Sequence, residues 1–271
     1  MILYPFAKIN LGLKVTSVRP DGYHNIETVF YPIIRLSDNL EVVESDIMDF
    51  KTTGLTIDGS DKGNLVLKAY ELLKNKYSLP PVKILLEKNI PMGAGLGGGS
   101  SDGSHMLMLL NDLFSLDIST EQLMDYALQL GSDCPFFIHG KPVFAMGRGE
   151  ILHDVNVDLG GFHLHVVKPP VSVSTAEAYK EVTPESSRLS LKGMVAFPVG
   201  HWNGNILNQF ETSVFKSHAE IKNIKDILYK QGSVFALMSG SGSAVYGLFH
   251  SEKRNMEKFF PSDYQIFSIK L

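Results

Sequence analysis

The chain has 271 residues, of which 44% are hydrophobic and 20% charged, and its formal net charge is −4. This composition excludes an intrinsically disordered chain and supplies enough apolar residues for one large domain or two modest ones. The acidic balance excludes a general affinity for nucleic acid or for acidic membranes, so an anionic ligand has to be held by local groups.

The cysteine content and the N-terminal residues indicate the compartment. Cys134 is the only cysteine, which excludes an intramolecular disulfide and favours a reducing environment. Its position between Asp133 and Pro135 favours a small buried side chain over a catalytic thiol. No basic segment followed by an apolar run opens the sequence, and no stretch reaches about 20 uncharged apolar residues. We therefore expect a cytoplasmic protein without a membrane span.

The first predicted element is a long strand over residues 2–16, interrupted at Pro5. Positions 9, 11, 13 and 15 are apolar and alternate with polar or small residues, as in a half-buried strand. Lys8 and Asn10 then share one face of the strand. A lysine on a strand is usually solvated, so Lys8 by itself indicates no function.

A Pro-Asp-Gly turn within residues 19–22 precedes a second predicted strand over residues 27–34. Tyr23, His24 and Phe30 place two aromatic rings and an imidazole near this corner, where they could sandwich a planar heterocycle. In the alternative interpretation Phe30 is a core residue and His24 is a surface residue of the turn. The residues themselves leave both interpretations open.

The next predicted elements lead to a glycine-rich stretch. Residues 39–44 alternate as a short strand, residues 47–59 predict a strand or hairpin around Gly54, and residues 64–76 carry the apolar stripe of a helix. A strand over residues 82–87 then brings the chain to the glycines.

Residues 91–105 read PMGAGLGGGSSDGSH and contain five glycines between positions 93 and 99. Glycines permit positive φ and leave no side chain between the backbone N–H groups and a ligand. The mostly apolar residues 106–114 predict a helix directly after the loop, and the start of a helix favours anions. Phosphate is therefore the expected ligand. A purely structural turn is the less favoured alternative, because five glycines within seven residues lose much conformational entropy on folding.

Three common phosphate-binding patterns do not fit this loop. A P-loop needs a lysine after the glycines, but the sequence continues Gly98-Gly99-Ser100. A dinucleotide-binding Rossmann unit needs a strand after the helix that ends in an acidic residue, whereas here a second helix is predicted. A protein kinase needs HRD and DFG motifs, and the sequence contains neither.

The second predicted helix spans residues 119–130, with a capping box from Ser119 to Gln122 and Gly131 as its stop. Asp133 follows and is itself followed by the uncharged residues 134–138. A carboxylate in this setting either caps a short turn or serves as a base whose pKa is set by burial. The sequence pattern alone leaves both roles open.

The second half of the chain mixes strands and helices. A short strand over residues 143–146 ends the first half, and the polar residues 155–162 predict a domain boundary. His163 and His165 alternate on the next strand, but no carboxylate or cysteine cluster accompanies them at ligand spacing, so we expect no metal site there. Residues 183–203 are loop-like, and residues 239–243 form a second glycine and serine loop. Further strands are predicted at 163–168, 234–238, 244–249 and 264–269, and helices at 174–180, 206–218, 220–231 and 252–260.

Three separated stretches together resemble a known family. Residues 5–11 (PFAKINL), 91–102 and 238–244 (MSGSGSA) are similar, in order and spacing, to the three motifs of the GHMP small-molecule kinases. Residues 19–24 (RPDGYH) and 130–135 (LGSDCP) narrow the match to one branch of that family. The resemblance covers nearly the whole chain.

The resemblance implies an α+β fold of two domains. Residues 1–155 would form a ribosomal-protein-like domain that binds ATP and holds the catalytic residues, and residues 156–271 a ferredoxin-like domain that closes the substrate cleft. The implied reaction is ATP-dependent phosphorylation of the 2-hydroxyl of 4-diphosphocytidyl-2-C-methyl-D-erythritol, a small molecule of the non-mevalonate isoprenoid precursor pathway. Mg²⁺ would be bound through the nucleotide. Neither the magnesium ligands nor the oligomeric state follow from the resemblance.

The resemblance also implies roles for individual residues. Asp133 corresponds to the family's catalytic base and Lys8 to the lysine beside it. The substrate-binding residues would be Asn10, Tyr23, His24, Phe30 and Tyr179. The residues around the ATP phosphates would be Pro91, Met92, Gly93, Ala94, Gly95, Leu96, Gly97, Gly98, Gly99, Ser100 and Ser101.

Two alternatives accompany this interpretation. One is another kinase of the family, of the homoserine or mevalonate type, which would lack a cytosine sandwich at Tyr23 and His24. The other is a non-catalytic nucleotide-binding or RNA-binding module on the same fold. The net charge of −4 and the presence of both Asp133 and Lys8 disfavour that module.

Overall fold

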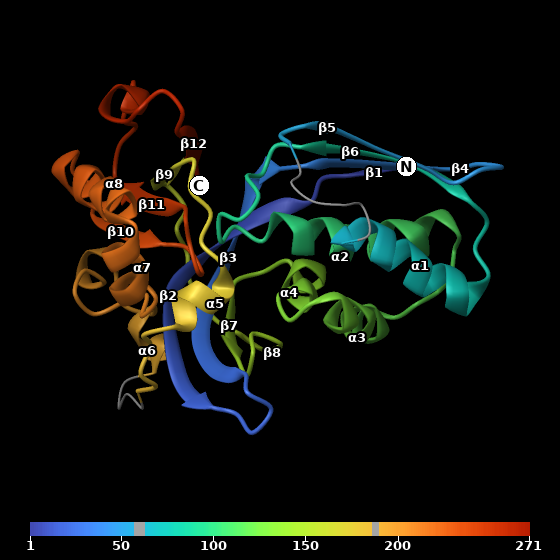
Figure 1. The fold of residues 1–271 in the computed structure, drawn as a ribbon, viewed down its shortest axis with the longest axis horizontal. Helices are drawn as coiled ribbons and strands as arrows, with labels where there is room; N and C mark the ends of the chain where they lie inside the picture. Colours follow the sequence, from blue (N-terminus) through green and yellow to red (C-terminus); the bar gives the residue numbers. More distant parts are fainter. Residues whose placement is uncertain (57–62, 186–189) are drawn as a thin grey trace. The chain divides into compact units, whose positions relative to one another are not determined.

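The computed structural model describes residues 1–56, 63–185 and 190–271. The chain divides into two compact units, each built from separated segments (Figure 1). The first unit contains Met1–Lys8, Pro32–Met92 and Gly97–Lys141, and the second contains Ile9–Tyr31, Gly93–Leu96 and Pro142–Leu271. The sequence-based division at residue 155 stays a prediction.

A four-stranded sheet forms one layer of the first unit. Its strand order is β1-β4-β6-β5, with β5 parallel to β6 and the other neighbours antiparallel. The strands are β1 (Ile2–Leu3), β4 (Asn39–Glu44), β5 (Asp49–Gly54) and β6 (Val82–Lys88). These bounds confirm the predicted strands at 39–44 and 82–87. Part of the predicted element 47–59 lies outside the described residues.

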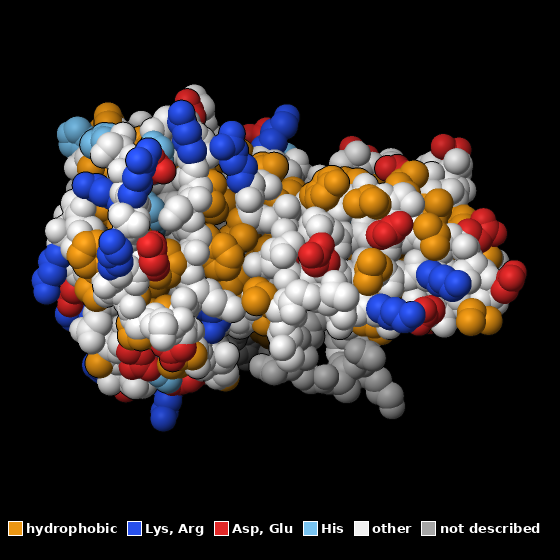
Figure 2. Space-filling view, turned by 90° about the horizontal axis from the view of Figure 1, so that it is seen from above, with side chains coloured by type: hydrophobic (Ala, Val, Ile, Leu, Met, Phe, Trp, Pro, Cys, Tyr) orange, Lys and Arg blue, Asp and Glu red, His pale blue; other side chains and the backbone are white. Residues whose placement is uncertain are grey.

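Helices cover one face of this sheet (Figure 1). They are α1 (Leu65–Tyr77), α2 (Gly98–Leu113), α3 (Thr120–Leu130) and α4 (Cys134–His139). The helix caps match the sequence signals: Asn64 accepts from the Val66 N–H, and Ser119 accepts from the Gln122 N–H. On the opposite face, exposed hydrophobic side chains lie among charged ones (Figure 2). Leu85 is one of the exposed residues that alternate with the buried residues of β6.

Helix α2 begins earlier than the sequence pattern predicts. Its first turns are made of the small residues at 98–104 rather than starting at Met106. Close packing against α1 accounts for this composition, because a Cβ on Gly103 would come within 2.8 Å of the Leu65 Cβ. The end of the glycine-rich stretch is therefore already helical.

The second unit contains two four-stranded sheets, with strand orders β2-β3-β7-β8 and β10-β11-β9-β12. In the first sheet β3 and β7, and likewise β7 and β8, pair antiparallel. The second sheet is antiparallel throughout. Strands β2 and β3 each have one end in the first unit. The strands are β2 (Phe6–Val18), β3 (His24–Ser37), β7 (Val143–Met146), β8 (Ile151–Asp154), β9 (His163–Lys168), β10 (Phe235–Met238), β11 (Val245–Phe249) and β12 (Gln265–Lys270). Sequence analysis missed β8.

The helices of the second unit are mostly short. They are α5 (Thr175–Tyr179), α6 (Leu191–Met194), α7 (Glu211–Ser217), α8 (Ala219–Lys230) and the 3₁₀ helices η2 (Val199–His201) and η3 (Met256–Phe259). Helix α8 buries Ile221, Ile224 and Leu228 at helical spacing in the core that includes residues of β10 and β11. Together, the two units confirm the predicted α+β class.

Two predicted helices of this unit are wrong in extent. The helix predicted over 252–260 is reduced to η3, because Asn255 adopts a left-handed φ of 60° directly before it. The helix predicted from residue 206 begins at Glu211, because the backbone around Asn208 pairs with Leu13 instead: the Leu13 N–H donates to the Leu207 carbonyl and the Gln209 N–H to the Leu13 carbonyl, both at 2.9 Å. Of the predicted loop 183–203, residues 186–189 lie outside the described residues.

Candidate active site

Lys8 and Asp133 form an ion pair in the first unit. Lys8 lies near the start of β2 and Asp133 directly precedes α4, and the Lys8 Nζ is 3.7 Å from the Asp133 Oδ2. Burial lowers the pKa of the Lys8 ammonium, and the Asp133 carboxylate opposes that shift. The Asp133 side chain is 35% exposed. A buried cation therefore lies beside a carboxylate that solvent and ligands can reach.

The Asp133 carboxylate does not cap the helix that it precedes. Asp133 occupies the N-cap position, but its side chain makes no capping hydrogen bond. Pro135 in the first turn has no N–H to be capped. Of the two roles left open by the sequence, the capping role is thus not the one that this carboxylate plays in the structure.

An aromatic cluster holds the elements that carry this pair. The Phe6 ring lies 5.5 Å from Phe137 and 6.3 Å from Phe136 of α4, and 5.3 Å from the imidazole of His105 in α2. Phe6 is two residues before Lys8, and Phe136 follows Asp133 by three. The cluster therefore packs β2, α2 and α4 together next to the ion pair. Sequence analysis missed this role, although the flanking aromatic residues were visible.

The end of the glycine stretch lies against the same pair. Gly97 has φ +74°, and a Cβ there would come within 2.6 Å of the Phe137 ring and 3.2 Å of the Lys8 Cγ. Only glycine allows this approach of the backbone to the lysine stem. Gly97 is also the N-cap of α2 and supplies no side-chain capping bond to its first N–H groups. The start of α2 thus combines a partial positive charge with uncapped donors.

The preceding part of the stretch belongs to the second unit and contacts the second glycine and serine loop. Gly95 has φ +72°, and a Cβ there would come within 1.9 Å of the Ser239 carbonyl oxygen. The Ser239 hydroxyl donates to the Gly95 carbonyl (2.8 Å), and the Ala244 N–H donates to the Ala94 carbonyl (3.2 Å). The loop at 239–243 therefore supports the glycine stretch.

Asn10 lies in the interior of the second unit. Its amide donates to the Thr28 hydroxyl (2.8 Å), its backbone N–H to the Ser239 hydroxyl (3.3 Å), and the Tyr246 hydroxyl donates to its carbonyl (2.9 Å). These bonds connect β2 to β3, β11 and the loop after β10. That Asn10 also contacts a substrate stays a prediction.

Three of the predicted substrate-binding residues lie around the turn before β3 or on α5. The His24 imidazole stacks on the Tyr179 ring, with centroids 4.5 Å apart and planes 23° from parallel. Tyr23 is 59% exposed, and the Arg148 guanidinium lies 5.4 Å from its ring centroid. Phe30 is only 2% exposed, as a core residue would be. The rings of Tyr23, His24 and Tyr179 are at least partly exposed, and their contact with a planar ligand stays a prediction.

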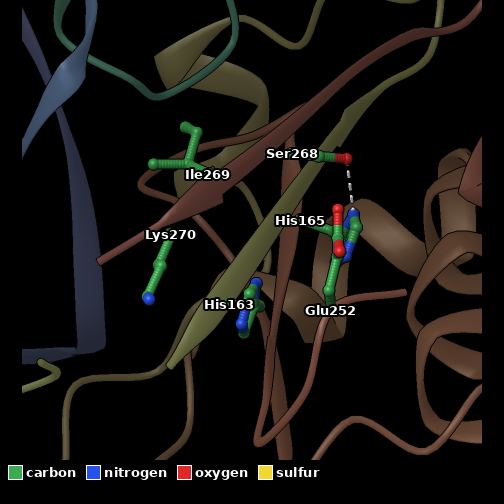
Figure 3. A pocket seen from close by; sticks show the side chains of 6 residues that line it. All are labelled: His163, His165, Glu252, Ser268, Ile269 and Lys270. Carbon is green, nitrogen blue, oxygen red and sulfur yellow. Dashed lines mark hydrogen bonds between the residues drawn. The ribbon is translucent and has the colours of Figure 1, made fainter. Parts of the chain in front are cut away.

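A separate polar hollow of about 400 Å³ lies on the second unit (Figure 3). The strands β9 and β12 supply most of its lining, and the Ser268 hydroxyl is 2.9 Å from the His165 Nδ1. It contains none of the predicted site residues. In the described part of the chain, no group of three or more His, Cys, Asp or Glu side chains could hold a metal ion. The lining residues are His163, His165, Glu252, Ser268, Ile269 and Lys270.

No helix among the described residues is both long enough and apolar enough to span a bilayer.

Two family descriptions match the sequence: "GHMP kinases N terminal domain" over residues 64–141 and "GHMP kinases C terminal" over residues 199–264. The chain is also similar over nearly its whole length to 4-diphosphocytidyl-2-C-methyl-D-erythritol kinases. It is 51% identical to that of Parabacteroides distasonis, covering 97% of both chains, and 50% identical to that of Bacteroides fragilis, covering 94% of both.

Solved structures agree with these sequence matches. A crystal structure of 4-(cytidine 5'-diphospho)-2C-methyl-D-erythritol kinase superposes with a TM-score of 0.81 at 32% identity, covering 99% of this chain and 98% of the other. A homoserine kinase from Cytophaga hutchinsonii superposes with a TM-score of 0.68 at 15% identity, covering 97% and 93%. The second match shows a shared fold alone.

Proposed function

The chain belongs to the GHMP kinases and is an enzyme that phosphorylates 4-diphosphocytidyl-2-C-methyl-D-erythritol with ATP, and we propose that Lys8 and Asp133 carry out the transfer. The observation that carries this assignment is the pairing of a buried lysine with an accessible carboxylate that makes no capping bond to α4, with the start of α2 packed against the lysine. Phosphoryl transfer depends mainly on positioning and on charge stabilisation, and this pair supplies both.

In the proposed reaction the substrate 2-hydroxyl attacks the γ-phosphorus of ATP. The new oxygen–phosphorus bond forms as the bond to the β,γ-bridging oxygen breaks, and ADP leaves. Asp133 accepts the proton of the hydroxyl as the general base. The Lys8 ammonium orients the hydroxyl and offsets negative charge on the transferring group. Because Asp133 raises the pKa of Lys8 against the effect of burial, the carboxylate also helps to keep this ammonium charged.

We propose that residues 91–101 hold the ATP phosphates through backbone N–H groups. Gly93, Gly95 and Gly97 all have positive φ, so the backbone takes a course that other residues rarely adopt. The start of α2 adds uncapped donors and a favourable dipole. These features support a phosphate cradle that lacks the lysine of a P-loop, with Lys8 as the cation instead.

We propose that Mg²⁺ arrives with the nucleotide. Mg²⁺ takes oxygen ligands and is commonly held by substrate phosphates with one or two carboxylates, rather than by a cage of protein groups. The described residues contain no cluster of three or more potential ligands, which fits this mode of binding. The ion would neutralise charge on the phosphates, while the chain's own residues position the hydroxyl and move its proton.

We propose that Tyr23, His24 and Tyr179 recognise the cytosine. Base stacking on an aromatic ring is favourable by about 1–3 kcal/mol. The imidazole of His24 already covers one face of Tyr179 at a 4.5 Å centroid separation, which leaves no room for a base between the two rings. A cytosine that stacks on that face therefore has to displace the imidazole, after which His24 is placed to contact the edge of the base.

A coupled assay of ADP release tests this function. The purified chain is given ATP with 4-diphosphocytidyl-2-C-methyl-D-erythritol, homoserine or mevalonate in parallel reactions. We expect turnover of the cytidine compound alone. Turnover of homoserine or mevalonate without turnover of the cytidine compound would contradict the substrate, and phosphorylation at a hydroxyl other than the 2-hydroxyl, read by phosphorus NMR of the product, would contradict the proposed geometry.

A further inference from the structure

Three charged side chains are buried next to the glycine stretch in the first unit. Lys88 ends β6, Asp38 precedes β4, and Asp102 lies in the second turn of α2. The side chains of Lys88 and Asp38 are 0% exposed and that of Asp102 is 4% exposed. The Lys88 Nζ donates to the Asp38 Oδ2 and to the Asp102 Oδ2, the latter at 2.6 Å. None of the three has a part in the phosphoryl transfer described above.

These bonds join the two ends of the glycine stretch. The Asp38 Oδ1 accepts from the backbone N–H groups of Asn89 (2.5 Å) and Ile90 (2.8 Å), the residues directly before Pro91. Lys88 then connects Asp38 to Asp102, which follows Ser101 in α2. The loop that begins at Pro91 and ends at Ser101 is thus held at its entry and at its exit by one set of bonds.

The set also lies directly beneath the first residue of α2. A Cβ on Gly98 would come within 3.3 Å of the Lys88 Nζ and 3.0 Å of the Ile90 Cγ2. The N–H groups at the start of α2 are among those proposed to bind phosphate. A shift of Lys88 or Asp102 would therefore be transmitted to the start of the helix without any change in the phosphate ligands themselves.

Stability alone does not account for this arrangement. Buried ion pairs contribute little to folding compared with apolar side chains of similar volume, because both charges lose their hydration. The Asp102 Oδ1 has no hydrogen-bond partner among the described residues, which adds to that cost. Burial raises the pKa of Asp102 to about 8, Lys88 opposes that shift and the Asp38 carboxylate adds to it, so keeping this carboxyl ionised is costly.

We propose that Asp102, Lys88 and Asp38 are positioning residues for ATP, which hold the two ends of the glycine stretch so that its N–H groups keep the spacing that the phosphates require. This inference rests on the proposed function, in which residues 91–101 bind the ATP phosphates. It assigns no contact with ATP to any of the three side chains. Asp102 is the most informative member, because its replacement cuts only the connection to α2 and leaves the bonds of Asp38 to Asn89 and Ile90 in place.

The test compares nucleotide affinity in the Asp102→Ala and Asp102→Asn variants of the full chain. The probe is a non-hydrolysable ATP analogue with Mg²⁺, measured by isothermal titration calorimetry. We expect Asp102→Ala to raise the dissociation constant about tenfold, the scale of losing one hydrogen bond to a charged group. The Michaelis constant for the cytidine substrate should change by less than about twofold. Asp102→Asn keeps an oxygen that accepts from Lys88 and has no charge, so it should restore nearly the wild-type affinity.

Leu73→Ala provides the matched control. Leu73 is fully buried in α1 of the same unit and is not in the glycine stretch. Its truncation should lower the melting temperature without raising the dissociation constant of the ATP analogue. If Asp102→Ala does not fold, Asp102→Ser takes its place, because the serine hydroxyl is too short to reach Lys88.

Three outcomes would overturn the inference. The first is wild-type affinity in Asp102→Ala with a lower melting temperature, as in Leu73→Ala, which would make the set merely structural. The second is a loss in Asp102→Asn equal to that in Asp102→Ala, which would mean that the charge of Asp102 acts directly. The third is an equal rise in the constants for ATP and for the cytidine substrate. Failure of the wild-type chain to bind the analogue would instead refute the proposed function.

Discussion

Two lysines of the first unit pair with aspartates, and the two sites differ in solvent exposure. The Lys8 Nζ lies 3.7 Å from Asp133, whose side chain is 35% exposed, whereas the Lys88 Nζ lies 2.6 Å from Asp102 within a set that is almost fully buried. A loose pair with an accessible carboxylate can exchange a proton with a ligand. A tight, enclosed set can only hold backbone segments in place. Lysine and aspartate thus take part in proton transfer at one site and hold backbone segments in place at the other.

Removing each lysine in turn should have very different consequences for the free energy of unfolding. Lys88→Met leaves two carboxylates buried without a cation, so we expect the free energy of unfolding to fall by about 3–5 kcal/mol. Lys8→Met leaves Asp133 partly solvated and should change it by less than about 1 kcal/mol. Urea denaturation measures both. Similar losses in the two variants would remove the distinction between the sites.

The Lys8→Met variant should instead lose turnover. Removing one charged group that stabilises the transferring phosphoryl group typically lowers kcat by about 10²-fold or more. The melting temperature and the affinity for the ATP analogue should stay close to those of the wild type, which steady-state kinetics and calorimetry can establish. A variant that retains more than half of the wild-type kcat would show that the ammonium of Lys8 is not needed for transfer.

His24→Ala tests a region of the second unit that belongs to neither pair. Loss of its contacts with the edge of the base should raise the Michaelis constant for the cytidine substrate about tenfold, on the scale of one hydrogen bond. The constant for ATP should change by less than about twofold. Equal rises for both substrates would mean that His24 supports the fold rather than the cytosine.

The pH dependence of kcat should show the smallest of these effects, and it tests the role of Lys8. Burial lowers the pKa of Lys8, so its ammonium loses the proton at a lower pH than an ordinary lysine, whose pKa is 10.5. An ammonium is charged below its pKa, so activity should be present at neutral pH and decline on the alkaline side before pH 10.5 is reached. A rate that stays constant through that value would contradict an essential Lys8 ammonium.

Local sequence signals predicted most elements of the fold. Alternation identified β4 and β6, and the Ser119 cap marked the start of α3, because these features depend on neighbouring residues. The start of α2 at Gly98 was missed, since glycine and serine are weak helix formers and only packing of Gly103 against Leu65 makes them helical there.

The candidate site was predictable to a lesser extent. Its motif residues were visible in the sequence. Whether the Asp133 carboxylate caps a helix or is free to react with a ligand depends, however, on the geometry before α4. The bond between Lys88 and Asp38 joins residues 50 positions apart, and no local pattern indicates it. Phe6 likewise meets Phe137 only through tertiary packing. Long-range contacts of this kind follow from the fold and not from spacing along the chain.

The most direct test of the central claim is a single-turnover measurement on Asp133→Asn with ATP labelled at the γ-phosphate. The carboxylate makes no capping bond and is partly exposed, so the amide should fold normally and bind the ATP analogue with nearly wild-type affinity. We predict that the rate of label transfer to 4-diphosphocytidyl-2-C-methyl-D-erythritol falls by about 10²-fold or more, the scale of a lost general base. A transfer rate near that of the wild type would contradict the assignment of Asp133 as the base.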